Sequence, residues 1–168
     1  MVGIVRKSAF FLSFLLILSV SGCGGTIPQD ENLLKQNLPI KSNPLGYNYK
    51  SPYTEVVARL KLYAKTCLSK RVIKTYAHNN SQTWTDLIPK MKIGQSHTRL
   101  TVQRKYGGMV LKLPAEPSDG RYFMVVDINK IDNKTTEAKY YPKHGHWSKW
   151  THMWLIGDLK VCPHPSRK

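Results

Sequence analysis

Hydrophobic residues recur at spacings of three and four in one early part of the chain, which predicts an amphipathic helix there. They are Tyr53, Val56, Val57, Leu60, Ala64, Cys67 and Leu68, whereas Arg59, Lys65, Thr66 and Lys70 fall elsewhere. Ser51 and Pro52 precede them as the expected N-cap and first helical residue. Cys67 lies on the apolar stripe, so we expect its thiol to face the core.

After this helix the hydrophobic pattern changes to a period of two, which is typical of strands. Strands are predicted at 71–77, 97–106, 109–113, 121–131, 135–141 and 149–161, and the segment 79–91 is expected to be a loop. Gly107-Gly108 is expected to form a two-residue turn that pairs Tyr106 with Met109. In that register Arg104 is a charged exception on the apolar face. Gly157-Asp158 is expected to be a bulge in the last strand.

These elements together predict the fold class. Short strands with turn signals and one early helix indicate an α+β domain. We expect two layers: an antiparallel meander of five or six strands, with one long N-terminal helix packed on it.

The first residues combine a positive start with an apolar run. Arg6 and Lys7 precede the run from Ser8 to Val20, which is shorter than the roughly 20 residues of a membrane-spanning helix. The run ends in Leu18-Ser-Val-Ser-Gly-Cys23, which resembles the lipobox of bacterial lipoproteins. The resemblance implies that residues 1–22 are a signal peptide and that Cys23 is lipidated. The alternative is an ordinary secretory signal followed by a chance cysteine.

The lipobox resemblance also implies a location. In the sorting rule of that family, Asp after the lipidated cysteine retains the protein in the inner membrane, and here that position is Gly24. We therefore expect an outer-membrane anchor facing the periplasm. Residues 23–49 contain Pro28, Pro39 and Pro44 and are expected to be a flexible tether, followed by a single domain over 50–168.

The charge of the chain is strongly positive. Its 26 Lys and Arg against 10 Asp and Glu give a formal net charge of +16, and removal of Arg6 and Lys7 with the signal peptide leaves +14. Such an excess attracts polyanions. For an exported protein the expected partners are anionic lipid, lipopolysaccharide, acidic glycan or an envelope protein, rather than nucleic acid.

Two cysteines remain once Cys23 is lipidated. Cys67 and Cys162 are expected to form a disulfide in the oxidising periplasm, the alternative being two buried reduced thiols. They are not in a C-x-x-C motif, which disfavours a redox enzyme.

The mature chain has a second resemblance. In its helix cysteine, its strands and its closing segment from Trp154 to Pro163, it resembles small envelope lipoproteins of proteobacteria. This resemblance brings no catalytic motif with it.

Three groups of residues are candidates for chemistry. His144, His146 and His152 could hold zinc, although solvated histidines on a surface loop are the simpler interpretation. Asp127, Asp158 and Glu137 are candidates for acid–base catalysis, and burial would raise the pKa of Asp127. Arg99, Lys105 and Lys112, with Lys90 and Lys92 nearby, could form a basic face that contacts an anionic surface, or be an ordinary solvated sheet face.

The sequence leaves two functions open. The first is a non-enzymatic, membrane-anchored envelope module that contacts an anionic surface or a protein partner, with no cofactor. The second is a periplasmic enzyme, metal-dependent in one form, that uses the histidine group.

Overall fold

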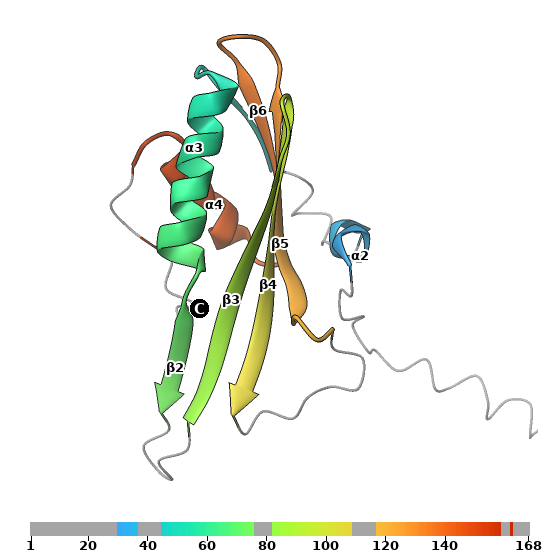
Figure 1. Cartoon of the computed structure of the whole chain (residues 1–168), viewed down its shortest axis with the longest axis vertical. Helices are drawn as coiled ribbons and strands as arrows, with labels where there is room; N and C mark the ends of the chain where they lie inside the picture. The colour runs from blue at the N-terminus through green and yellow to red at the C-terminus, as the bar shows by residue number, and fades with distance from the viewer. Residues whose placement is uncertain (1–29, 37–44, 76–81, 109–116, 159–161, 163–168) are drawn as a thin grey trace, which may run out of the picture.

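The computed structural model describes residues 30–36, 45–75, 82–108, 117–158 and 162. Its centre is an open antiparallel sheet of six strands in the order β1-β6-β5-β4-β3-β2 (Figure 1). The strands are β1 (Leu45–Tyr49), β2 (Arg71–Thr75), β3 (Gln82–Ile93), β4 (His97–Gly108), β5 (Arg121–Lys130) and β6 (Thr136–Pro142). Strands β2 to β6 form a meander, and β1 adds to the outer edge of β6. The mixed α+β architecture is therefore the one predicted.

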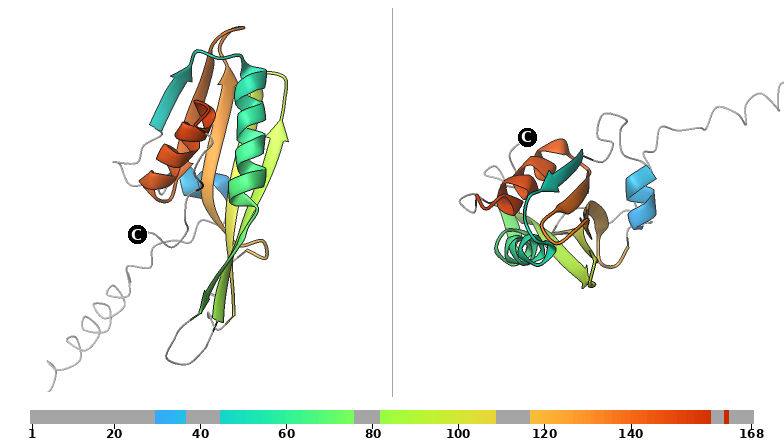
Figure 2. Two further views of the ribbon diagram at one scale, coloured as in Figure 1. Left: turned by 90° about the vertical axis from the view of Figure 1, so that its left-hand side faces the viewer. Right: turned by 90° about the horizontal axis from the view of Figure 1, so that it is seen from above.

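Helices lie on both faces of this sheet (Figures 1 and 2). On one face are α3 (Tyr53–Tyr63), its π-helical continuation η2 (Ala64–Leu68), and α4 (Gly145–Leu155). The short α2 (Glu31–Gln36) packs against β5 on the opposite face. The prediction of two layers with one helix is thus too simple, because two further segments form helices. None of the helices in the described residues is long and apolar enough to cross a membrane.

The main core lies between the sheet and helices α3 and α4. Val56 and Leu60 of α3 and Val126 and Ile128 of β5 are completely buried. Burying each such side chain contributes about 1.5–3 kcal/mol, which explains why the apolar stripe of α3 faces the sheet. The start of α3 is fixed by Tyr53, whose hydroxyl lies 2.6 Å from Thr98 Oγ1 on β4.

The predicted last strand is instead the helix α4. Its buried residues Trp147, Thr151, Trp154 and Leu155 are spaced by three and four, the spacing of one helix face. The tryptophans favoured a strand because aromatic residues have high β-propensity, and packing against the core overrides that preference. Gly157 is a helix end and not a bulge: its φ is +99°, and the Asp158 and Gly157 amides donate to Met153 and Trp154.

The segment predicted as a loop at 79–91 contains most of β3. Apolar residues occur on both faces of this strand: Leu87 and Met91 point toward the core, and Trp84 and Ile88 point away from it. The hydrophobic period of two is therefore not visible in the sequence.

The prediction of a two-residue turn at Gly107-Gly108 is also wrong. Both glycines belong to β4, and Gly107 pairs with Trp84, whose indole lies where a side chain at 107 would be. The predicted strand 109–113 lies outside the described residues.

The predicted tether contains two ordered elements. α2 buries Leu34 on the sheet, and β1 pairs along β6 from Leu45↔Tyr140 to Tyr49↔Thr136. Residues 31–36 and 45–49, which the prediction assigned to the tether, therefore belong to the compact part of the fold that the structure describes.

Candidate functional site

A basic pocket of about 160 Å³ lies between the end of β4, the start of β5 and the segment that leads into α4. Its walls combine cationic and aromatic side chains, and the described residues that line it include no Asp or Glu. They are Arg104, Tyr106, Arg121, Tyr122, Phe123, Lys143 and His144.

Two arginines face each other across the strands that form the pocket. Arg104 of β4 and Arg121 of β5 are direct register partners. Like charges at such positions destabilise a sheet, because their side chains are close. Aromatic rings partly offset this repulsion: the Arg104 guanidinium lies 5.1 Å from the ring centres of both Tyr106 and Phe123, and Arg121 lies 5.5 Å from that of Tyr106.

A bulge in β5 shapes the pocket. Val102 pairs with Met124 and Gln103 with Tyr122, so Phe123 is an extra residue on β5. Its ring packs edge-on against Trp147 of α4, with ring centres 4.9 Å apart. Its carbonyl accepts a hydrogen bond from the Lys143 amide at 2.9 Å. The bulge thereby brings the start of α4 to the two arginines.

Lys143 and His144 experience the positive field of this pocket. Burial lowers the pKa of Lys143, and the charges of Arg121 and Arg104 lower it further. The pKa of His144 is also lowered, by burial and then by His146, Lys143 and Arg104. Groups that repel one another in this way are stabilised by a bound anion.

The N-terminus of α4 adds to the positive potential. His144 is the N-cap residue, its side chain makes no capping hydrogen bond, and the first turn of α4 has no acidic residue. The helix dipole places partial positive charge at this end. Pocket and helix end together form a site suited to an anion.

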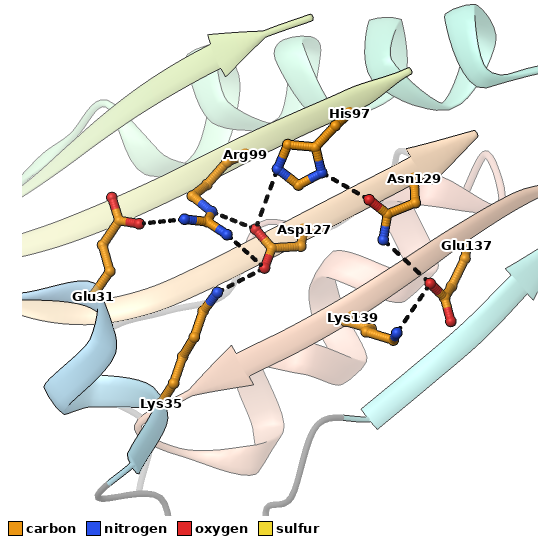
Figure 3. Close-up of polar contacts among 8 residues, drawn as sticks. All are labelled: Glu31, Lys35, His97, Arg99, Asp127, Asn129, Glu137 and Lys139. Carbon is orange, nitrogen blue, oxygen red and sulfur yellow. Dashed lines mark hydrogen bonds and ion pairs between the residues drawn. The ribbon is translucent and has the colours of Figure 1, made fainter. Parts of the chain in front are cut away.

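A second polar cluster lies on the opposite face of the sheet, around Asp127 (Figure 3). The Asp127 carboxylate accepts hydrogen bonds from Arg99 and, at 2.7 Å, from Lys35 of α2. Arg99 also donates to Glu31 at 2.9 Å. Burial alone would raise the pKa of Asp127, but the bonds from Arg99 and Lys35 outweigh burial and lower it. The expectation of a raised pKa is therefore wrong, and this cluster is a balanced ion-pair network that holds α2.

The other acid–base candidates are not poised for catalysis. Glu137 accepts from Asn129 and pairs with Lys139, both at 3.2 Å (Figure 3). Asp158 is exposed just after α4.

The predicted basic face is only partly present. Arg99 and Lys105 lie on the same face of β4, but the charge of Arg99 is neutralised by Asp127 and Glu31. Lys105 is exposed, Lys90 pairs with Asp119, and Lys112 lies outside the described residues. Arg99 is thus a structural residue, because the register of β4 with β5 places it directly opposite Asp127.

The three candidate zinc histidines do not converge. His152 Nδ1 lies 2.7 Å from the Tyr49 hydroxyl, and its ring stacks on Tyr47 of β1. His144 and His146 stack on each other with ring centres 5.9 Å apart, at the other end of α4. Within the ranges that the structure describes, no three His, Cys, Asp or Glu side chains are grouped to hold a metal.

The structure joins Cys67 and Cys162 by a disulfide. Cys67 belongs to η2, and Cys162 follows α4 rather than lying in a strand. Cys23 lies outside the described residues.

Sequence reasoning missed most of the basic pocket. The one sign of the pocket in the sequence was Arg104, the charged exception on the apolar face of the predicted hairpin. Arg121 and Lys143 gave none, because a basic residue at a strand end is ordinary and only the β-sheet register and the bulge bring the two together.

No family model and no curated protein matches this sequence. Among solved structures it is similar to the crystal structure of a conserved protein from Geobacillus kaustophilus, at 13% identity and a TM-score of 0.29. That match covers 67% of this chain and 86% of the other. The similarity is too weak to support an inference about function.

Proposed function

We propose that this protein is a lipoprotein of the bacterial envelope, anchored through Cys23 in the outer membrane and facing the periplasm, whose domain binds an anionic group without catalysing a reaction. The anchor is supported by the lipobox-like residues Leu18 to Cys23. The binding role is supported by one observation above all. Arg104, Arg121 and Lys143 converge on a pocket whose described lining residues include no Asp or Glu.

The pocket is a better candidate than diffuse surface charge. Elsewhere, Lys35 of α2 and the strand residues Arg71, Lys90 and Arg99 each have a carboxylate within 3.0 Å. Those pairs attract an anion weakly, because each positive charge is already neutralised. The pocket instead brings Arg104, Arg121 and Lys143 together, with no Asp or Glu among its described lining residues.

Vesicle binding tests this function. The soluble form of residues 24–168 should bind vesicles containing phosphatidic acid more tightly than vesicles of neutral phosphatidylcholine, and less tightly as salt rises. Each basic residue near an anionic surface contributes about 1 kcal/mol. The triple variant Arg104→Gln, Arg121→Gln, Lys143→Gln should therefore lose about a hundredfold in affinity.

A matched control removes three exposed charges outside the pocket, by Lys61→Gln, Lys105→Gln and Lys149→Gln. It should retain most of the binding. Equal losses in the two triple variants would show that only the total charge matters, and the pocket would not be the binding site. Thermal unfolding of each variant checks that the fold is intact.

A further inference from the structure

We infer that two turns at one end of the sheet form a surface that contacts an anionic membrane, and that this contact orients the anchored domain. The turns are residues 93–97, where β3 leads into β4, and residues 130–135, where β5 leads into β6. We call them together the turn surface. The inference rests on the proposed lipid anchor but not on the basic pocket.

The two turns adjoin each other. The Lys130 amide donates a hydrogen bond to the Ser96 carbonyl at 2.8 Å and so joins one turn to the other. The Tyr53 hydroxyl donates to the Gly94 carbonyl at 2.8 Å, which attaches the start of α3 to the same end. Figure 1 shows both turns at the end of the sheet where α3 begins, and β2 at the opposite end. The fold therefore holds the turn surface in shape before it meets a partner.

Each turn exposes one isoleucine. Ile93 is 55% exposed and Ile131 is 58% exposed. A single exposed apolar residue is ordinary on a protein surface. Two on adjoining turns can enter a membrane together, at the boundary between headgroups and acyl chains where segments that lie on a membrane bury their apolar side chains.

Lysines surround the two isoleucines. Those exposed in or beside the turns are Lys50, Lys92, Lys130 and Lys134. Lys50 belongs to this end because the carbonyl of Ser51, the next residue, accepts a hydrogen bond from Thr136 at the start of β6. Asp132 is the one carboxylate of the turn surface, and its Oδ1 accepts from the Lys134 and Thr135 amides. Four lysines against one aspartate give an excess of positive charge, which attracts anionic lipid.

The anchor favours this end of the domain. Glu31 of α2 accepts a hydrogen bond from Arg99 at 2.9 Å, and Arg99 lies two positions along β4 from His97, which is roughly 7 Å. Arg104 of the basic pocket lies seven positions from His97, which is roughly 24 Å. A chain that runs from a lipid on Cys23 to Glu31 therefore holds the turn surface closer to the membrane than the pocket.

The anchor also makes a weak contact sufficient. A tethered surface meets the membrane at a high effective concentration, so few inserted side chains are needed to orient the domain. The soluble form of the domain lacks this tether, and the turn surface adds little to its vesicle binding. In the anchored protein the pocket stands away from the anchoring membrane and remains open to an anionic ligand.

A fluorescent label on the turn surface tests the contact. Cys23 is lipidated in the proposed mature protein and Cys67 is bonded to Cys162, so Gln95→Cys adds the only free thiol. Gln82→Cys, exposed at the opposite end of β3, is the matched control. The lipidated protein, labelled at either position, is reconstituted in vesicles whose acyl chains carry nitroxide quenchers. With phosphatidylglycerol in the vesicles, the label at residue 95 should be quenched and the label at residue 82 should not.

The lipid charge is tested with the same label. In vesicles of phosphatidylcholine alone, and at high salt, quenching at residue 95 should fall, because the lysines lose their attraction to the surface. Equal quenching at residues 95 and 82, or equal quenching in charged and neutral vesicles, would overturn the inference. Mass spectrometry first verifies the lipid on Cys23, and an unmodified Cys23 would overturn both the anchor and this inference.

Three isoleucines of similar exposure supply matched variants. Ile93→Ser and Ile131→Ser should each lower the ratio of docked to undocked protein about fivefold, because each removes a partly inserted apolar side chain. Ile73 is 59% exposed but belongs to β2, at the other end of the sheet. Ile73→Ser should leave the ratio unchanged. Quenching at residue 95 that is the same in all three variants as in the parent would show that the isoleucines do not insert, and the inference would be wrong.

A pocket variant separates this inference from the proposed anion binding. Lys143→Gln should leave quenching at residue 95 unchanged, because the pocket does not touch the anchoring membrane. Loss of that quenching in Lys143→Gln would mean that the pocket holds the domain on the membrane, and would overturn the inference. Absence of quenching at residue 95 in the parent would also overturn it, while anion binding by the pocket is measured separately on the soluble form.

Discussion

Asp127 and Arg104 are both charged residues within adjacent strands, and their surroundings differ in sign. The buried carboxylate of Asp127 forms ion pairs with Arg99 and Lys35. Arg104 faces another arginine across the sheet. A buried charge is tolerated when it is paired, so the first arrangement stabilises the fold, whereas two like charges in register oppose each other.

Asp127→Asn should lower the free energy of unfolding at pH 7 by about 2 kcal/mol, between the values for exposed and buried pairs. The folded pKa of Asp127 lies below the unfolded value of about 3.9. Its contribution is therefore complete above that value and is lost as pH falls through the folded pKa. Urea unfolding at pH 7 and pH 3 should show the difference between parent and variant shrinking at the lower pH.

The exposed pair of Asp119 with Lys90 provides the control for this measurement. Asp119→Asn should change stability little at either pH, because solvent screens exposed ion pairs. A loss in Asp127→Asn that is the same at pH 7 and pH 3 would mean that the ion pairs do not carry the effect.

At the scale of elements, the sequence predicted those helices and strands whose own hydrophobic pattern determines their structure. α3, β5 and β6 have clear periods and turn residues, and all were anticipated close to their observed bounds. The six-residue α2 was not, because so short a helix is unstable alone and depends on burial of Leu34 and on the Asp127 network. β1 depends on pairing with β6, which is distant in sequence, and α4 on packing of its tryptophans. The pocket is built from such long-range placements, so only Arg104 hinted at it.

The disulfide between Cys67 and Cys162 fastens η2 to the chain that follows α4, across 95 positions. The chain-entropy model gives about 4 to 5 kcal/mol for a loop of that length, as an upper figure. Reduction should therefore lower the melting temperature markedly. The double variant Cys67→Ser, Cys162→Ser should melt at the temperature of the reduced parent. Two free thiols in the unreduced, unfolded protein would refute the bond.

At the scale of the whole molecule, α2 limits how far the domain can stand from its proposed anchor. Glu31 lies only eight positions after Cys23, and at 3.3–3.6 Å per residue even an extended chain over that distance spans roughly 28 Å. Because Glu31 and Lys35 bind the sheet face that carries Asp127, this face lies within that reach of the membrane when α2 is docked.

The anchor itself can be tested on the full chain. Cys23→Ala should leave the precursor uncleaved by the lipoprotein signal peptidase and unlabelled by a radioactive fatty acid, because the thiol that accepts the lipid is gone. Cys67→Ala is the control and should be labelled like the parent. Incorporation of label into Cys23→Ala would contradict the proposed anchor.

The pairing of β1 with β6 has a consequence for the order of folding in time. Among the strands that the structure describes, β1 comes first in sequence and β6 last, yet they are neighbours in the sheet. A polypeptide synthesised from its N-terminus must therefore hold residues 45–49 unpaired until residues 136–142 have emerged, and non-local pairing of this kind folds slowly. Oxidation of Cys67 must wait longer still, for Cys162. The sheet and the disulfide of this protein can therefore be completed only after its C-terminal residues have emerged.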